Sequence, residues 1–544
     1  MSRAARWHLA GVLAVVAATA ALYLPFLGNP LVFDDRIFFS GHRFAYYALN
    51  PLGLDLRLPP YFTLALTEVL WSKSIEAQRI ASLVLHIGVA LMLYRLLLDL
   101  QRAALPAHSQ ADTPLRAAIG AVAFALHPVA VYGAGYLVQR SIVMATLFGL
   151  VSAVLFLRGL RRGSHADALS AALLFWLAVL SKEHAVLLPA AVALLALLAG
   201  AARPLALRHV ALYWAACAPA AIFVTLRSLG IIGGAYEESA GAIAAQIVAA
   251  WGDELVEPSL ALSTVTQAGL FFKYVGLWLW PGPGGMSIDL RVDFAAGWTA
   301  GWIVAKVAAF SAWGVIGAVL LLRRGPLAMA GFGMLYAWVL YFVEFSAVRY
   351  QEPYVLYRSY LWGPGIACIV VAALSKLPRP AVLGAGALAC AGLAYSAHDR
   401  LVAFSHPLRL WEDAAAKLPD APIPWGSRTL YHLGREYLYA GEPEKAIAVT
   451  ERCARLYPET VHCVYARGAI HLHQEQYELA RKYLLRAIEL KPAEGLLYHR
   501  LGLALEGMER LEEAKAAYRR ADELGYGGGA FELERLARPE RKQK

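Results

Sequence analysis

Charged residues are scarce in this sequence. They make up 17% of its 544 residues, whereas 59% are hydrophobic and the mean hydropathy is +0.49. Soluble globular proteins carry about 25% charged residues. The composition therefore excludes an ordinary soluble domain and predicts a polytopic membrane protein.

Motifs for metals and nucleotides are also lacking. The sequence has no paired-cysteine spacing, no His-Glu-x-x-His motif and no Walker-type loop. We therefore predict no resident cofactor and no metal-ligating residues, and leave a divalent metal requirement open.

Cysteine is rare, with five in the chain. Cys453 and Cys463 lie in a polar region on either side of Pro458. A disulfide between them and two free thiols are equally compatible with the sequence. The other three lie in apolar runs, where packing is the default role of a small side chain: Cys217, Cys368 and Cys390.

Long apolar runs, by contrast, are abundant. They recur from residue 8 to about residue 397, for example at 142–157 and 307–322. Each could cross much or all of about 30 Å of hydrocarbon as a helix. We predict an all-α membrane domain over residues 1–397 with about eleven spans, and we interpret 264–281 as a re-entrant or interfacial segment.

The basic residues fall mainly in short connections between the apolar runs and in the polar C-terminal region. This position favours a role in topology over nucleic-acid binding for the formal charge of +10. Arg3 and Arg6 precede the first run, and Arg323 and Arg324 follow a later one. If these clusters face the cytoplasm, the acidic and aromatic connections face outward, as does the C-terminal region. The N-terminus resembles a signal peptide, but its apolar run continues through Leu27, so we favour an uncleaved anchor.

The polar C-terminal region repeats every 34 residues. Gly434, Gly468 and Gly502 recur at this interval, and small residues follow it elsewhere. The period predicts about three tetratricopeptide repeats over 425–528, preceded by a linker and capping helix over 398–424 and followed by a charged tail over 529–544. Such repeats usually present a concave surface to a protein or peptide, although they could also merely rigidify the membrane domain.

Two adjacent carboxylates follow the first apolar run. Asp34 and Asp35 lie at its predicted outer end, where a charge is costly unless it is solvated or functional. Either a solvated turn or a catalytic site fits this position.

Further ionisable residues gather in the predicted outer connections. Each has an ordinary alternative: a helix-end histidine, a snorkelling or interfacial arginine, or a solvated turn. The candidates for binding a substrate or a carrier phosphate are Arg57, His127, Arg140, Lys182, Glu183, His184, Glu352 and Arg358.

Taken in order, these residues and the repeats resemble one family. The matching segments are the acidic pair, the stretch from Arg57 into a run with His86, His127-Pro128 to Arg140, Lys182-Glu183, and Tyr357-Arg358-Ser-Tyr360-Leu361. The chain resembles the TMTC-like (transmembrane and tetratricopeptide repeat-containing) proteins of the GT-C glycosyltransferase superfamily over nearly its whole length. In this sequence Tyr357 stands where an acidic residue is expected, and the repeat array is short.

The resemblance implies a GT-C-like fold and a membrane enzyme that takes a sugar from a polyprenyl-phosphate carrier. It places a catalytic carboxylate at Asp34 or Asp35, and Arg140, Lys182 and Arg358 near the carrier phosphate. We expect inverting transfer to a hydroxyl of a protein acceptor, with the active site and the repeats on the periplasmic side of a bacterial inner membrane.

The residues are consistent with this chemistry. A positioned Asp can remove the proton of an attacking hydroxyl, and a phosphate leaving group needs nearby cations instead of a second acid. Two other hypotheses stay open: a transporter or flippase of lipid-linked sugar, and a noncatalytic scaffold that binds proteins through its repeats.

Overall fold

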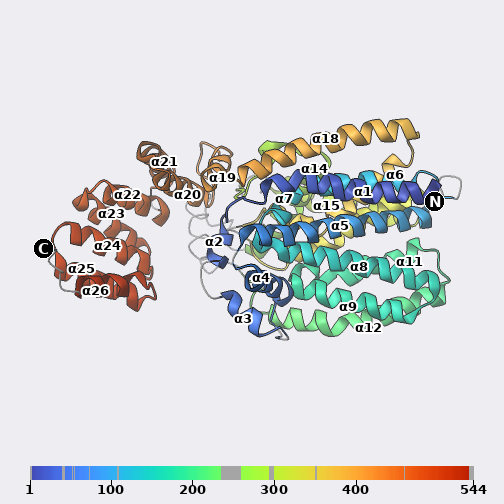
Figure 1. Cartoon of the computed structure of the whole chain (residues 1–544), viewed down its shortest axis with the longest axis horizontal. Coiled ribbons are helices and arrows are strands. Elements are labelled where there is room, and N and C mark those ends of the chain that lie inside the picture. The colour runs from blue at the N-terminus through green and yellow to red at the C-terminus, as the bar shows by residue number, and fades with distance from the viewer. Residues whose placement is uncertain are drawn as a thin grey trace. The chain divides into compact units, whose positions relative to one another are not determined.

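The computed structural model describes residues 3–39, 43–51, 53, 55–72, 74–106, 110–234, 259–292, 299–349, 352–458 and 460–537. Its regular elements are helices, which confirms the predicted all-α class. The chain forms two compact units, Met1–Pro407 and Leu408–Lys544 (Figure 1).

The first unit is a bundle of long helices joined by short ones. Helix α8 packs against α5 and α9, and α9 packs against α12. The helices of this unit are α1 (Arg3–Tyr23), α2 (Asp34–Phe39), α3 (Arg43–Leu49), α4 (Leu58–Trp71), α5 (Ile75–Ala104), α6 (Thr113–Ala125), α7 (Pro128–Ala134), α8 (Arg140–Arg162), α9 (His165–Ser181), α10 (Leu188–Ala193), α11 (Leu195–Leu198), α12 (Arg203–Arg227), α14 (Ser259–Leu279), α15 (Ala300–Leu321), α16 (Pro326–Tyr341), α17 (Gly363–Leu374) and α18 (Arg379–Ala403). Short 3₁₀ turns join them at η1 (Leu24–Phe26), η3 (Leu137–Gln139), η4 (Glu183–Leu187), η6 (Pro283–Gly285), η7 (Phe342–Phe345) and η8 (Leu356–Tyr360).

Seven helices in the described part of the chain are long and apolar enough to cross a membrane, and the bent pair α6 and α7 would be an eighth. Three shorter apolar helices, at 165–181, 183–198 and 363–374, bring the number to the predicted eleven only if they also cross. A re-entrant segment needs a break at depth. The segment 264–281 lies mostly within α14, an unbroken helix of 21 residues, which does not fit the re-entrant alternative. The interfacial alternative stays a prediction.

Local sequence signals explain where several of these helices begin. The Ser74 side chain accepts a hydrogen bond from the Ala77 N–H and caps α5, and Ser164 caps α9 in the same way through Asp167. Proline in the first turn starts α6, α12, α16 and α18.

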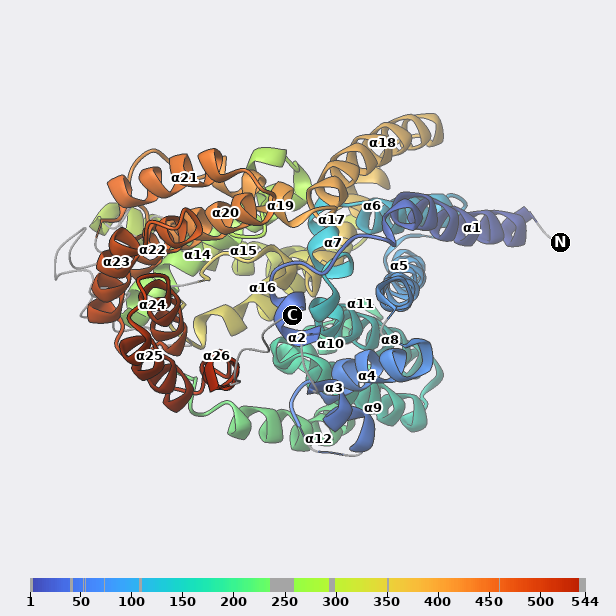
Figure 2. The ribbon, with the colours of Figure 1, turned by 60° about the vertical axis from the view of Figure 1, so that its left-hand side comes forward.

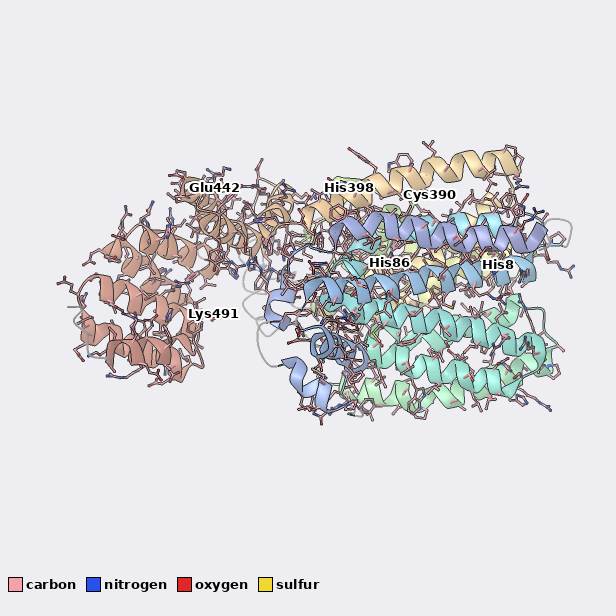
Figure 3. All side chains as sticks on the ribbon, in the orientation of Figure 1. His8, His86, Cys390, His398, Glu442 and Lys491 are labelled. Carbon is pink, nitrogen blue, oxygen red and sulfur yellow. A yellow bond between two sulfur atoms is a disulfide. The ribbon has the colours of Figure 1, made fainter. Side chains whose placement is uncertain are left out.

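A sharp bend separates α6 from α7. The two helices meet at 64°, and the break falls at His127, whose Nδ1 accepts a hydrogen bond from the Val129 N–H while Pro128 starts α7. Nearby, His86 of α5 (Figure 3) donates through Nε2 to the Ala125 carbonyl at 3.0 Å and contacts the Tyr360 hydroxyl at 2.6 Å. These contacts tie α5, α6 and η8 together around the bend.

The second unit consists of helical hairpins. Its helices are α19 (Pro407–Ala415), α20 (Gly426–Tyr439), α21 (Pro443–Leu456), α22 (Val461–His473), α23 (Tyr477–Leu490), α24 (Gly495–Gly507), α25 (Leu511–Glu523) and α26 (Gly528–Ala537). A Cβ on Gly502 would lie 2.4 Å from the Tyr518 ring, and one on Gly468 would lie 3.0 Å from Leu484. The recurring glycines therefore let the two helices of a hairpin approach closely.

The ends of the repeat array are covered by further helices. Trp411 of α19 stacks on His432 with ring centroids 4.3 Å apart, and the Tyr437 hydroxyl donates to Glu412 at 2.8 Å. At the other end α26 packs against α25, so the predicted tail begins as a helix, and 538–544 lie outside the described residues. The predicted boundary after residue 397 falls inside α18, which runs to Ala403.

Cys453 and Cys463 form a disulfide. It joins α21 to α22, and therefore the first hairpin to the second. The structure thus selects the disulfide from the two alternatives that the sequence leaves open.

Candidate active site

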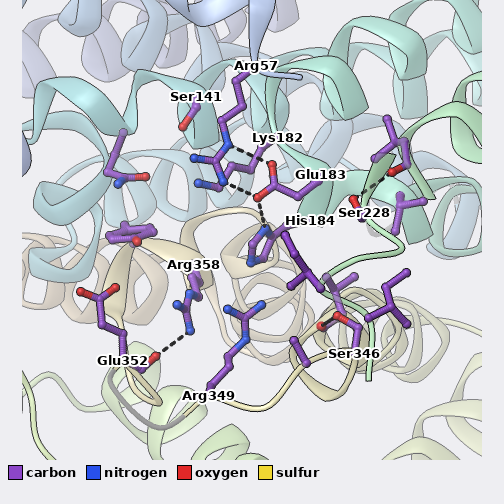
Figure 4. Close-up of a pocket in the computed structure, with 18 of the residues that line it drawn as sticks. Arg57, Ser141, Lys182, Glu183, His184, Ser228, Ser346, Arg349, Glu352 and Arg358 are labelled. Carbon is purple, nitrogen blue, oxygen red and sulfur yellow. Dashed lines mark hydrogen bonds and ion pairs between the residues drawn. The ribbon is translucent and has the colours of Figure 1, made fainter. Parts of the chain in front are cut away.

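A cavity of about 560 Å³ lies in the first unit. Its walls come from segments far apart in sequence: α2, the start of α4, the junction of α9 and η4, the end of α12, and the stretch from η7 to η8. Figure 4 shows Arg57 and Lys182 on one side of it and Arg349 and Arg358 on the other. The wall next to α12 and η7 is apolar, with Ile231, Ile232, Phe342 and Val343. One surface of the cavity therefore suits an anion and another a hydrocarbon.

The two adjacent carboxylates have different surroundings. Asp34 lines the cavity, and its backbone N–H donates to the Tyr136 hydroxyl at 3.1 Å. Asp35 is fully buried and accepts the backbone N–H groups of Val138 at 2.8 Å and Leu137 at 3.3 Å. Burial raises the pKa of Asp35 to about 7, although these two N–H donors oppose the rise. Asp34 is therefore the carboxylate that can meet a ligand, whereas Asp35 fixes the backbone of η3.

Strained backbone flanks the cavity at two positions. Phe33, directly before Asp34, has φ of 48°, and Arg57, directly before α4, has φ of 63°. Side chains other than glycine rarely occupy this left-handed region, and such residues concentrate at functional sites. At Arg57 the conformation is held by Glu183: Arg57 Nε donates to Oε2 at 3.0 Å, and Nη2 donates to Oε1. This two-point pair joins α4 to η4 at the cavity wall.

Glu344, which does not itself line the cavity, lies at the centre of a buried ionic cluster. Its Oε2 is 3.0 Å from Arg349 Nε and 3.3 Å from Arg358 Nη1, and its Oε1 is 3.4 Å from His184 Nε2. We call these four residues the Glu344 cluster. Arg358 also donates to the Glu352 carbonyl at 3.0 Å, which ties η8 to the preceding loop. One carboxylate is thus shared between two guanidinium groups that line the cavity.

Lys182 lies on the same side of the cavity as Arg57. It is buried, forms no ion pair with any carboxylate that the structure describes, and has its Nζ 5.6 Å from the centroid of the Tyr357 ring. Burial, together with the charges of Arg57, Arg358 and Arg349, lowers the pKa of Lys182 to about 7. An incoming anion would favour its protonated form.

The structure brings seven of the ten predicted site residues to this cavity: Asp34, Arg57, Lys182, Glu183, His184, Glu352 and Arg358. Three lie elsewhere. Asp35 is enclosed as described, and His127 lines a different cavity. Arg140 is 1% exposed and donates to Ser82 Oγ at 3.2 Å and, through Nη2, to the carbonyl and side-chain oxygens of Gln78 at 2.7 and 2.8 Å. Its guanidinium therefore joins α8 to α5 and does not line the cavity.

Two residues of the site were missed by sequence reasoning. Arg349 stands in the same outer segment as Arg358, so its position was a usable signal. Glu344 sits in an apolar run at the end of α16, and only its buried arginine partners mark it as important.

A carboxylate and several buried cations in one cavity have complementary roles. The carboxylate can accept a proton from a hydroxyl, and the cations can bind a phosphate. In the described part of the chain, no three His, Cys, Asp or Glu side chains come together as metal ligands do.

The comparisons with known proteins support the repeats. Residues 427–460, 461–494 and 496–524 match the tetratricopeptide repeat family, which confirms the three predicted repeats. Among curated relatives, BBSome complex member BBS4 of Mus musculus is 30% identical over 115 residues, or 21% of each protein. The same protein of Bos taurus is 31% identical over 121 residues, or 22% of each. The chain thus spans about a fifth of the length of the curated relatives it matches.

A solved structure is similar over more of the chain. The oligosaccharyltransferase of Archaeoglobus fulgidus in the apo form is 13% identical with a TM-score of 0.40, and the match covers 78% of this chain and 60% of that one. We draw no argument about function from a likeness this distant. Because the repeat matches cover the C-terminal region alone, the resemblance of the whole chain to TMTC-like proteins stays a prediction.

Proposed function

We propose that this protein is a GT-C-type membrane glycosyltransferase. It moves a sugar from a polyprenyl-phosphate carrier to a hydroxyl of a protein acceptor on the extracytoplasmic side of the membrane. The observation that carries the proposal is the placement of Asp34 in the same cavity as Arg57, Lys182, Arg349 and Arg358. The apolar helices of the first unit and the resemblance of the site segments to TMTC-like proteins support it.

In the proposed reaction Asp34 is the general base. It takes the proton of the acceptor hydroxyl while the hydroxyl oxygen forms a bond to the anomeric carbon. The bond from that carbon to the carrier phosphate breaks, and its electron pair leaves with the phosphate. Because the nucleophile enters opposite the leaving group, the product has the inverted configuration.

The cations stabilise the charge that develops on the leaving group. A carrier phosphodiester has one negative charge, and the released phosphate monoester carries up to two. Lys182, Arg349 and Arg358 line the cavity in which the phosphate would bind. Their burial strengthens their attraction to the phosphate relative to the same attraction in water. The apolar wall formed by α12 and η7 gives the first isoprene units of the carrier a surface to contact.

The second unit supplies the proposed contact with the acceptor. Tetratricopeptide repeats commonly bind proteins through stacked hairpins, and the Cys453–Cys463 disulfide fits an oxidising compartment such as the periplasm. The repeats support a protein acceptor, and the disulfide supports transfer outside the cytoplasm.

Replacement of Asp34 tests the proposal in cells. In a strain that lacks the native chain, we expect wild type to add sugar masses to extracytoplasmic proteins and Asp34→Asn to add none, as read by intact-mass spectrometry. Asp55→Asn is the matched control, because Asp55 bonds to the Tyr46 hydroxyl at 3.0 Å and does not line the cavity. Equal glycosylation by Asp34→Asn and wild type would refute the role of Asp34. A lipid product in place of a protein product would refute the protein acceptor.

A further inference from the structure

A second cavity, of about 580 Å³, lies among α6, α14, α17 and α18 of the first unit. It shares no lining residue with the candidate active site. Small residues on three of these helices line it. They are Gly120 and Ala123 on α6, Gly363 and Ala367 on α17, and Ala389 and Gly392 on α18.

The remaining walls of this cavity are mostly apolar. Phe124, Ile366, Val370, Leu388 and Leu393 contribute hydrocarbon. Figure 2 shows α18 at the edge of the bundle, where it packs against α6 and α7, and its Leu388 is 77% exposed. For a helix apolar enough to cross a membrane, the medium outside that edge is lipid. The cavity therefore opens toward hydrocarbon chains.

One buried polar atom faces this cavity. His127 is 3% exposed, and its Nδ1 accepts the Val129 N–H at 3.2 Å, so its hydrogen is on Nε2. Among the described residues Nε2 has no hydrogen bond of ordinary geometry, and the Trp278 carbonyl is the polar backbone group near it. The imidazole stacks on the Trp278 ring with centroids 4.3 Å apart, which fixes its direction. A buried donor without a well-aligned partner is unfavourable, so an acceptor in the cavity would stabilise it.

The depth of His127 in the membrane points to the kind of acceptor. Trp280, which also lines the cavity, follows the end of α14, two residues after the Trp278 that stacks on His127, and is 86% exposed. Exposed tryptophans concentrate at the boundary between hydrocarbon and headgroups. The ester groups of glycerophospholipids lie at that level, with their acyl chains below.

We propose that this cavity is a binding site for a bilayer glycerophospholipid. One acyl chain lies against the small residues of α6, α17 and α18, and an ester carbonyl of the lipid accepts the Nε2–H of His127. The lipid also packs against Trp278, whose indole N–H donates to Ser359 Oγ at 3.0 Å, next to Arg358. The proposal does not depend on the reaction assigned to the other cavity.

Two glycines of α18 allow a matched test. A Cβ would meet nothing within 4 Å at either Gly392 or Gly384, but Gly392 lines the cavity and Gly384 does not. The full-length protein is purified from membranes in mild detergent, and bound phospholipid is measured by native mass spectrometry. We expect Gly392→Leu to lower the lipid-bound fraction about tenfold, equivalent to about 1.4 kcal/mol, and Gly384→Leu to leave it unchanged. Ala389→Phe should lower it as Gly392→Leu does, with both variants monodisperse.

The ester carbonyl is tested with two lipids of equal chain length. Wild type reconstituted with ester-linked phosphatidylcholine should retain more lipid than wild type reconstituted with the ether-linked analogue. Equal lipid retention by Gly392→Leu and wild type would overturn the site. Retention of polyprenyl phosphate instead of phospholipid would overturn the occupant, and equal retention of the two phosphatidylcholines would overturn the bond to His127.

Discussion

Two clusters of arginines around a carboxylate, at Glu344 and at Asp99, differ in the exposure of their arginines. In the Glu344 cluster the side chains of Arg349 and Arg358 are 7% and 6% exposed. Near the last turns of α5 and α8, Asp99 pairs with Arg95 at 2.8 Å and Arg161 at 3.0 Å, but these two arginines are 45% and 34% exposed. Similar residues therefore form one cluster with buried arginines beside a cavity, and another whose arginines are exposed to solvent.

Exposure separates a functional cluster of charges from an ordinary one. The Asp99 side chain is as buried as that of Glu344, at 4% exposed, so the two clusters differ in their arginines. Ion pairs with exposed partners contribute about 0–1 kcal/mol because water competes for the exposed group. Buried guanidinium groups are costly to desolvate, and a protein that keeps two of them around one carboxylate gains most when an anion joins them. Burial next to a cavity, more than the number of charges, distinguishes the candidate phosphate site.

In this comparison, the largest difference should appear when one arginine is removed from each cluster. Arg358→Ala should lower the rate of sugar transfer about 10²–10³-fold, because a cation facing the leaving phosphate is lost. Arg161→Ala should leave the rate within about twofold, because exposed pairs contribute little. Initial rates on membranes normalised for protein amount give both numbers. Equal losses of transfer rate in the two variants would abolish the distinction between the two clusters.

The next effect concerns the carboxylates. Glu344→Gln should lower the free energy of unfolding by about 3–5 kcal/mol, because Arg349 and Arg358 stay buried without their shared partner. Asp99→Asn should cost about 1 kcal/mol, since its arginines can turn to solvent. Thermal unfolding in detergent measures both. A polyprenyl phosphate should stabilise Glu344→Gln more than wild type, and a smaller gain than in wild type would contradict the account.

The third effect is a pH dependence of sugar transfer that arises at Lys182, beside the buried arginines. Lys182 loses its charge as the pH rises through its lowered pKa of about 7. Above that pH, kcat/KM for the carrier should fall by up to about tenfold per pH unit, since kcat/KM reports the free enzyme. Lys182→Arg should remove the fall because arginine stays charged. An unchanged profile in that variant would exclude Lys182 as its origin.

The smallest effect is expected at Asp167, which pairs with an Arg158 side chain that is 44% exposed. Asp167→Asn should change the unfolding free energy by less than about 1 kcal/mol and leave transfer unchanged. Denaturant melts and the same rate assay test this. A loss of sugar transfer would show that the exposed ion pair of Asp167 and Arg158 also contributes to the reaction.

Regular features of the chain could be predicted from the sequence. The 34-residue period marks the repeats because every hairpin needs a small residue where its helices meet, as at Gly468 and Gly502. The order of polar segments between apolar runs placed Asp34, Arg57, Lys182 and Arg358 in one site.

Tertiary details of the site could not be predicted. Asp34 and Asp35 are adjacent, and only the packing of η3 against α2 decides which one is enclosed. Arg140 looked like a phosphate ligand, but Gln78, 62 residues away, holds it inside the bundle. The number of spans could not be counted from the sequence either. The bend at His127 and several short apolar helices make it uncertain from the sequence which apolar runs cross the membrane as single helices.

The central claim is that Asp34 carries out the chemistry while the cations hold the carrier. The most direct test uses purified protein with a polyprenyl-phosphate sugar, and measures carrier binding and transfer side by side for wild type and Asp34→Asn. We predict that Asp34→Asn binds the carrier as wild type does and transfers sugar about 10²–10⁴-fold more slowly, as expected for a lost general base. Transfer at the wild-type rate with unchanged binding would contradict this assignment.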